Sequence, residues 1–276
     1  MNAELQKKTA PPVVLTIAGF DPSSGAGVTA DLKVFAAHGL YGVSAITALT
    51  VQSTQGVRRT EPVDPVILEE TLFCLADDGP IEGVKIGMLA TAANVAAAAA
   101  FLRNSRIPSQ RVVLDPVIRS SSGRELLDRE GVDRLRGELL DLVGWITPNV
   151  EELAVLISRP VSGAGDVPRA AAALQSDCPG LNVIVTGGHL NPPNDFLRTA
   201  GGAERWFAGE WIETSATHGT GCAFSSALLA ALVEGKTEVA AVSAAKEYVR
   251  KAMRAAWRVG KGRGPMHHLF NLESGT

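Results

Sequence analysis

The sequence has few cysteines, few aromatic residues and little excess charge. Its 276 residues include 3 cysteines, 5% aromatic residues and a formal net charge of −3. Cysteines so few, odd in number and far apart exclude a disulfide-stapled secreted scaffold. The near-neutral charge argues against a dedicated nucleic-acid binder, which normally carries a basic face. Neither a Cys-x-x-Cys motif nor a histidine pair with zinc-ligand spacing occurs.

Long hydrophobic runs are also missing. The longest, 92–102 and 221–233, are too short and too rich in alanine to span a bilayer. Residues 1–12 are polar and contain no apolar stretch, so we expect a flexible segment there and not a signal peptide. These features predict a cytoplasmic protein in a reducing compartment, without a membrane partner.

What is present fits a globular α/β protein. Hydrophobic residues make up 46% of the chain and charged residues 20%, which excludes disorder and allows a sizeable core. We expect one domain over 13–270 and a tail over 271–276, with no internal repeat. A loop rich in Pro, Gly and Asn, 190–203, is a candidate mobile flap.

Short apolar segments alternate with segments of helical periodicity along the chain. The predicted strands are 13–18, 43–51, 84–86, 112–114, 145–147 and 183–185, with a candidate hairpin at 206–213. The predicted helices are 25–38, 65–75, 91–103, 131–142, 148–157, 167–175, 221–233 and 237–257. This alternation predicts a parallel or mixed sheet covered by helices on both faces.

Polar and small residues follow the predicted strands at their carboxyl ends. They are Asp21, Gln52, Met88, Asp115, Asn149 and Gly187. In open α/β sheets this edge carries the ligand crevice, so we expect the functional site there.

Two glycine patterns resemble nucleotide-binding motifs without meeting their requirements. Gly25-Ala-Gly27-Val-Thr-Ala30 matches a dinucleotide pattern, but its turn is not tight and no acidic residue follows at the required distance. A helix entry that allows close backbone approach is the better interpretation. Gly235-Lys-Thr237 resembles the end of a P-loop, but Ala230 stands where the first glycine is needed, which indicates a helix C-cap.

The segment His218-Gly-Thr-Gly-Cys222 precedes an apolar helix. Free amides at a helix N-terminus bind anions and stabilise charge on a transferring phosphoryl group. The same field predicts a lowered pKa for the Cys222 thiol. The alternative is a small cysteine that packs beneath the helix.

Several ordered motifs carry a family resemblance over most of the chain. They lie at 16–33, 41–52, 85–89, 114–117, 146–149, 187–189, 217–222 and 260–268. Together they resemble the hydroxymethylpyrimidine/phosphomethylpyrimidine kinases of thiamine biosynthesis. The resemblance implies a ribokinase-like fold, a central, mostly parallel sheet between helices on both faces, and a homodimer. It also implies ATP-dependent phosphorylation of hydroxymethylpyrimidine and then of its monophosphate.

The resemblance assigns the catalytic loop to the start of the helix at 221–233. Gly219, Thr220 and Gly221 would form the anion hole, and Cys222 would accept the hydroxyl proton. Many sugar kinases of the superfamily have Asp at the last of these positions.

The resemblance assigns the ATP and Mg²⁺ side of the site to residues after the central strands. Asn149 and Glu152 match an Asn-x-x-Glu element, and a capping box is the structural alternative. Asp115 is a second candidate for phosphate and magnesium, or a turn-forming residue before Pro116. Thr186 and Gly188 lie on the nucleotide side.

Pyrimidine recognition carries over to seven further positions. These are Ala26, Gln52, Met88 and Val117, with Gly19, Asp21 and Thr50 nearby. The Gln52 amide can offer a donor and an acceptor to an aminopyrimidine, or can bond a loop at the strand end. Met88 can form an adaptable apolar wall or belong to the core.

Two departures from the family pattern leave other functions open. Ser121 and Thr186 stand where the family has lysine, although Arg119 and Arg124 can restore positive charge near the first position. The alternatives are a pyridoxal kinase of the same fold and a non-catalytic paralogue that binds the pyrimidine or ATP.

Overall fold

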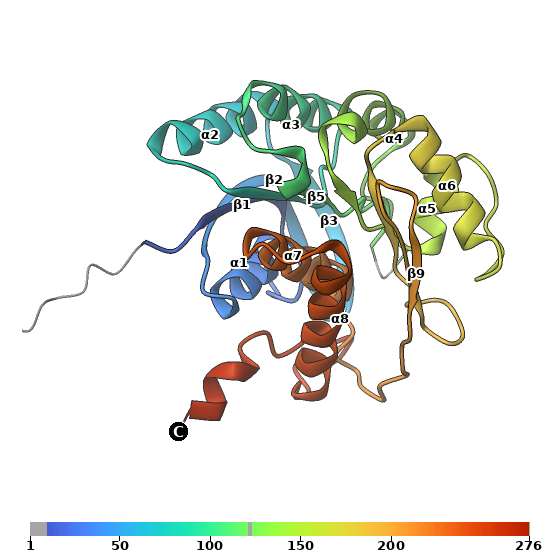
Figure 1. Ribbon diagram of the computed structural model, residues 1–276. Coiled ribbons are helices and arrows are strands. Elements are labelled where there is room, and N and C mark those ends of the chain that lie inside the picture. Colours follow the sequence, from blue (N-terminus) through green and yellow to red (C-terminus); the bar gives the residue numbers. More distant parts are fainter. Residues whose placement is uncertain (1–9, 121–122, 276) are drawn as a thin grey trace, which may run out of the picture.

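The computed structural model describes residues 10–120 and 123–275. In these residues nine strands form a single sheet in the order β3-β2-β1-β4-β5-β6-β7-β8-β9 (Figure 1). Within the same part of the chain, no helix is both long and apolar enough to cross a membrane.

The centre of the sheet is parallel and its two edges are antiparallel. The parallel strands are β1 (Val13–Phe20), β2 (Tyr41–Ser53), β4 (Gly83–Ile86), β5 (Val112–Leu114), β6 (Trp145–Ile146) and β7 (Asn182–Val185). The antiparallel strands are β3 (Gly56–Pro62) at one edge, and β8 (Asp195–Arg198) and β9 (Glu204–Phe207) at the other. All the parallel strands therefore direct their carboxyl ends to one edge of the molecule.

Helices cover both faces of this sheet (Figure 1). One face carries α2 (Pro65–Asp78), α3 (Ala92–Asn104), α4 (Arg129–Arg134), α5 (Val150–Leu156) and α6 (Val167–Asp177). The other face carries α1 (Gly27–Ala37), α7 (Thr220–Val233) and α8 (Glu238–Arg254). Short turns lie at η1 (Ser109–Arg111), η2 (Leu135–Leu139, a π-helical turn), η3 (Leu140–Leu142) and η4 (Phe270–Gly275).

The two-sided burial explains why the central strands are apolar at every position. Successive side chains on a strand point to opposite faces. Accordingly Val113 belongs to the core under α7 and α8, while Leu114 belongs to the core under α2 to α6. A strand that is buried on both faces has a continuous hydrophobic sequence, which is the pattern from which these strands were predicted.

The predicted α/β fold with a mostly parallel sheet between helices is confirmed, but four elements differ. The strand β3 was not predicted. The expected flap at 190–203 is wrong, because Asp195–Arg198 pairs with β7 as β8. The expected hairpin at 206–213 is also wrong, because the hairpin is formed by β8 and β9 and ends at Phe207.

The fourth difference is the segment 131–142, which is not one α-helix. It runs through α4, then a π-helical turn and a 3-10 turn. Two other predictions fall on residues that the structure does not describe. Most of the expected flexible segment lies in 1–9, and Ser121 lies in the gap at 121–122.

Candidate active site

The carboxyl end of β5 and the N-terminus of α7 meet at the edge of the sheet where the crevice is expected. Asp115 follows β5 and is 5% exposed. A Cβ atom built on Gly221 would lie 3.8 Å from Oδ2 of Asp115, so the first turn of α7 faces this carboxylate. The expected location of the site at this edge is consistent with that contact.

The start of α7 depends on a glycine in a left-handed conformation. Gly219 is the N-cap residue, with φ +78° and ψ 18°. A Cβ atom there would lie 1.9 Å from the carbonyl oxygen of Gly25, so the loop before α1 packs directly on the loop before α7. The first amides of α7 have no acceptor within the helix, which gives the crevice an anion-binding end.

Cys222 lies on this first turn and is partly buried. Burial raises the pKa of its thiol to about 12, with Asp115 and Asp31 adding to the rise and Lys85 opposing it. The prediction of a lowered pKa is therefore wrong, because loss of water and two nearby carboxylates outweigh the field of the helix. At neutral pH the sulfur is held as a thiol.

Asp115 and Glu152 form a pair of buried carboxyl groups. Burial and the charge of Asp115 raise the pKa of Glu152 to about 8. Burial also raises the pKa of Asp115, against the lowering effect of Lys85. Two carboxylates that repel each other in a dry site fit a divalent cation, which prefers oxygen ligands.

A magnesium ion at this pair would need further oxygen ligands. Among the described residues, no group of three or more His, Cys, Asp or Glu side chains is arranged to hold a metal. Mg²⁺ usually keeps several waters and binds through one or two carboxylates plus phosphate oxygens. The pair therefore fits a magnesium ion that arrives with a nucleotide.

The capping box expected at the start of α5 is present. The amide of Asn149 donates to Oε2 of Glu152 at 2.9 Å, and the amide of Glu152 donates to Oδ1 of Asn149 at 2.9 Å. This exchange fixes the Glu152 side chain, so a structural role and a ligand role can belong to the same residues. Thr186 pairs with Asn149 in a parallel bridge, which places the end of β7 beside this turn.

Gly188 lies two residues beyond Thr186 on an open part of the same edge. No atom lies within 4 Å of a Cβ position built on it. The preceding Gly187 donates its amide to Oδ1 of Asp195 at 2.7 Å. The loop after β7 is thus tied to β8 while Gly188 remains accessible to a ligand.

Asp21 organises the loop between β1 and α1. Its carboxylate accepts hydrogen bonds from the amides of Ser23, Gly25 and Ala26 and from the Ser23 hydroxyl, at 2.7 to 3.2 Å. It also receives Nε2 of His218 at 2.8 Å. With five donors directed at two oxygens, Asp21 shapes the loop and has little capacity left for a ligand.

The remaining expected substrate residues lie on two sides of the same crevice. Met88 is 8% exposed and packs with Ala48, Leu126 and the partly buried Val117. A Cβ atom on Gly19 would lie 2.9 Å from Cε of Met88, so the end of β1 closes onto this apolar wall. Gln52 lies on β2, where its Nε2 atom is 3.0 Å from Nε2 of His218.

The sequence analysis missed a buried ionic network beneath the crevice. Lys85 and Asp31 are both fully buried, and Nζ lies 2.9 Å from Oδ2. The hydroxyls of Thr16 and Ser226 also donate to Asp31, at 2.6 and 2.8 Å. Burial would lower the pKa of Lys85, but the Asp31 carboxylate outweighs it and raises that pKa. A lysine inside an apolar strand was the signal that could have revealed the network.

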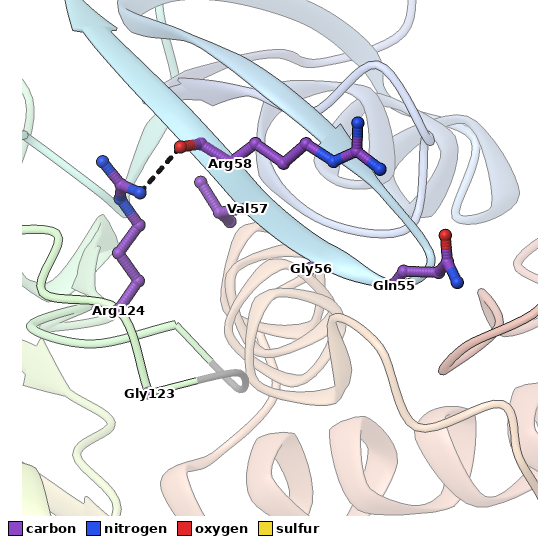
Figure 2. A pocket seen from close by; sticks show the side chains of 6 residues that line it. All are labelled: Gln55, Gly56, Val57, Arg58, Gly123 and Arg124. Carbon is purple, nitrogen blue, oxygen red and sulfur yellow. Dashed lines mark hydrogen bonds between the residues drawn. The ribbon is translucent and has the colours of Figure 1, made fainter.

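A separate pocket lies at the outer end of the hairpin formed by β2 and β3. It has a volume of about 440 Å³ and is lined by Gln55, Gly56, Val57, Arg58, Gly123 and Arg124. Figure 2 shows Arg124 donating a hydrogen bond to the carbonyl oxygen of Arg58, at 2.7 Å, while the Arg58 side chain points away. None of the expected site residues lines this pocket.

Comparison with known proteins identifies the family. A family model described as phosphomethylpyrimidine kinase matches residues 21–267. The chain belongs to the phosphomethylpyrimidine kinase family. A member from Aquifex aeolicus, named hydroxymethylpyrimidine/phosphomethylpyrimidine kinase, is 40% identical over 252 residues, which are 91% of this chain and 97% of that protein.

Solved structures place the phosphomethylpyrimidine kinase family beside the pyridoxal kinases. A phosphomethylpyrimidine kinase from Clostridium difficile has a TM-score of 0.77 at 33% identity, over 87% of this chain and 99% of that chain. A pyridoxal kinase from Staphylococcus aureus in complex with ADP has a TM-score of 0.86 at 30% identity, over 95% and 96% of the two chains. The ribokinase-like fold is confirmed. Backbone similarity alone does not separate the two substrates.

Proposed function

We propose that this phosphotransferase uses ATP to phosphorylate hydroxymethylpyrimidine and then its monophosphate, which gives the pyrophosphate needed for thiamine diphosphate biosynthesis. One observation carries the proposal. His218 contacts the Gln52 amide at 3.0 Å and is followed directly by Gly219 at the start of α7. An amide suited to an aminopyrimidine and a helix N-terminus suited to a phosphoryl group therefore belong to one crevice.

The chemical step joins these two parts of the site. The hydroxymethyl oxygen attacks the γ-phosphorus of ATP, the bond to the β–γ bridging oxygen breaks, and ADP leaves. Amides of Gly219, Thr220 and Gly221 stabilise the transferring phosphoryl group, and the thiolate form of Cys222 accepts the hydroxyl proton to become the thiol. Because the thiol pKa is raised to about 12, the thiolate is a minor form before the reaction.

The ATP side of the proposal rests on the buried carboxyl pair and the loop after β7. Asp115 and Glu152 would hold Mg²⁺, which neutralises phosphate charge when it is bound. Asn149, Thr186 and Gly188 would line the nucleotide. Thr186 offers a hydroxyl where other family members offer a lysine, so more of the anion binding falls to the amides of α7.

The pyrimidine would lie against the other half of the crevice. Met88, Val117 and Gly19 supply an apolar wall for the ring. Gln52 supplies the hydrogen bonds, with Thr50 and Ala26 beside it. A second candidate substrate is pyridoxal, because the pyridoxal kinase from Staphylococcus aureus superposes with a TM-score of 0.86.

The test is ATP consumption by the purified protein with Mg²⁺ and one acceptor at a time. The acceptors are hydroxymethylpyrimidine, its monophosphate and pyridoxal. We expect turnover with the first two. Turnover with pyridoxal alone would keep the site and change the substrate, and binding without turnover of any acceptor would establish a non-catalytic paralogue.

The proposal also covers the number of domains, the cellular location and the oligomeric state of the protein. One continuous sheet supports a single domain over 13–270. A cytoplasmic location follows from the need to keep the Cys222 thiol reduced.

A homodimer is supported by exposed apolar side chains on β2. Leu49 is 52% exposed and Val51 is 55% exposed, and both lie on β2. We expect light scattering to give twice the mass of one chain, and Leu49→Glu to give one chain mass. A wild-type monomer would overturn this part of the proposal.

A further inference from the structure

A chain of hydrogen-bonding groups runs from the loop before α1 to the end of β1 and passes through Gln52. Oδ2 of Asp21 lies 2.8 Å from Nε2 of His218, and the same Nε2 lies 3.0 Å from the Gln52 amide. The other end of this amide lies 3.2 Å from Oγ1 of Thr50, which lies 3.0 Å from the carbonyl oxygen of Phe20. Each of these distances fits a hydrogen bond, and Nε2 of His218 has at most one hydrogen atom for its two partners.

The hydrogen atoms in this chain can be assigned from the Asp21 end. Burial would raise the pKa of Asp21, but hydrogen bonds from His218 and Ser23 outweigh burial and lower it. An ionised carboxylate only accepts, so Nε2 of His218 must carry the hydrogen. An N–H of the Gln52 amide cannot face that N–H at 3.0 Å. Because the nitrogen and oxygen of a carboxamide are distinguished only by their hydrogen bonds, we assign the Gln52 amide in the reverse direction. Its oxygen then lies on the His218 side and shares the single Nε2 hydrogen with Asp21.

The Thr50 end leads to the same assignment. The hydroxyl of Thr50 has one hydrogen atom, and the Phe20 carbonyl can only accept it. Oγ1 of Thr50 is then left as an acceptor, which requires the NH₂ group of Gln52 on its side. Both ends of the chain therefore fix the amide in a single direction.

This direction is defined relative to the phosphoryl-transfer end of the crevice. The His218 ring and Gly219 both pack on Gly25, whereas Thr50 bonds the end of β1. We therefore assign the amide oxygen of Gln52 to the side of the anion hole and the NH₂ group to the side of β1. A bound ring then meets an acceptor next to its reacting hydroxymethyl group and a donor one position further along.

We propose that His218, held by Asp21, is a specificity-determining positioning residue that fixes the Gln52 amide to select acceptors with a hydrogen-bond donor beside the hydroxymethyl group. The inference rests on the proposed function. In hydroxymethylpyrimidine the neighbour is an amino group, followed by a ring nitrogen, which matches the oxygen and then the NH₂ of Gln52. In pyridoxal the neighbour is an aldehyde oxygen, which would face the amide oxygen.

The experiment compares variants that remove or keep the hydrogen at this position. His218→Phe keeps a ring against Gly25, where the present ring packs closely, but removes the donor. His218→Gln places a donor near the same point. The readout is the ratio of kcat/KM for hydroxymethylpyrimidine to that for pyridoxal, with KM for ATP measured in parallel. Where pyridoxal is not phosphorylated, its inhibition constant against hydroxymethylpyrimidine replaces the second value.

We expect His218→Phe to lower this ratio roughly 10- to 100-fold. The amide oxygen of Gln52 then loses its hydrogen-bond donor, so the amide is no longer held in one direction. His218→Gln should keep the ratio within a few-fold, and KM for ATP should stay the same in both variants. The proposal would be overturned if His218→Phe left the ratio unchanged, including by lowering kcat/KM equally for hydroxymethylpyrimidine and pyridoxal.

Thr50 gives an independent test if His218→Phe does not fold. Thr50→Val removes the acceptor for the NH₂ group at nearly constant volume, and Thr50→Ser keeps it. We expect the ratio to fall in the first and to persist in the second, and an unchanged ratio in Thr50→Val overturns the proposal. If the wild-type enzyme phosphorylates no acceptor, the proposed function fails, while calorimetric affinities for the two ligands still give the ratio that tests His218.

Discussion

At the scale of single residues, the sulfur of Cys222 is the proposed proton acceptor. We expect Cys222→Ser to lower kcat for hydroxymethylpyrimidine by about 10²- to 10⁴-fold, the usual contribution of general base catalysis. KM for ATP should change little, since the anion hole consists of backbone amides. Steady-state kinetics with Cys74→Ser as the control makes the comparison, because Cys74 is exposed and lies outside the crevice. A full-rate Cys222→Ser enzyme would remove the assignment.

His268 makes the free energy of unfolding depend on pH. Burial, with smaller contributions from Lys33 and His267, lowers the pKa of His268 to about 4 from its ordinary 6.5. Between these values the unfolded chain binds a proton that the folded chain does not, so stability falls as the pH drops from 6.5 toward 4.

We expect His268→Phe to flatten this pH dependence, because phenylalanine fills the buried site without a proton to bind. Thermal unfolding at several pH values between 4 and 7 measures the slope. The exposed His189→Gln is the matched control and should keep the wild-type slope. Parallel curves for wild type and His268→Phe would contradict the prediction.

Site residues could be predicted from the sequence where they directly follow a strand. They were harder to predict where their chemistry depends on side chains that come together from distant parts of the chain. Asp115 could be placed at the crevice because the carboxyl ends of parallel strands share one edge. The pKa of Cys222 could not be predicted, since it depends on burial and on carboxylates that reach the sulfur from other elements. The pair of Asp31 and Lys85 joins residues 54 positions apart, a distance that no local pattern spans.

At the scale of elements, the position of α7 depends on the conformation of its N-cap residue. Gly219 and Gly235 flank this helix with nearly equal backbone angles, φ +78° and φ +82°. A Cβ atom on Gly219 would meet the Gly25 carbonyl at 1.9 Å, whereas nothing lies within 4 Å of one on Gly235. An alanine at either position would strain the backbone, but only an alanine at Gly219 would also collide with a neighbouring atom.

We expect Gly219→Ala to lower kcat roughly 100-fold, because a displacement of about 1 Å at the reacting groups has an effect of that size. Gly235→Ala should keep kcat and lose about 1 kcal/mol of stability through strain alone. Kinetics and denaturant unfolding of both variants give the comparison. Equal kcat values in the two variants would show that α7 adjusts without consequence.

Helices and strands that are buried could be predicted from the sequence more accurately than exposed ones. Strands buried on both faces, such as β5, were predicted with their observed bounds from apolar runs. The edge strand β3 was missed because its Arg58 and Arg59 are exposed and no face is apolar. The strand β8 was hidden in a segment rich in turn residues, and its pairing with β7 is a tertiary contact that composition does not encode.

At the scale of the whole molecule, the buried pair of Lys85 and Asp31 ties four elements together. Lys85 lies on β4, Asp31 on α1, and the hydroxyls that join them on β1 and α7. We expect Lys85→Met to lower stability by about 3–5 kcal/mol, because it leaves an uncompensated buried charge. Urea unfolding measures the change.

The double variant Lys85→Met/Asp31→Leu tests the cause. Removing both charges should recover a large part of the loss, since two apolar groups leave no charge to desolvate. If the double variant is less stable than either single variant, shape and not charge governs this site.

The length of β2 has a consequence for which part of the sheet selects the substrate. This strand has 13 residues, while the parallel strand β4 has 4, and beyond Leu49 the partner of β2 is β3. Thr50 and Gln52 therefore lie on a two-stranded ribbon that leaves the parallel core. If these residues contact the substrate as proposed, we expect mutations in the ribbon to change which acceptor is phosphorylated while the parallel core that carries the catalytic loop stays intact. Substrate choice and phosphoryl transfer are in this way assigned to separate parts of one sheet.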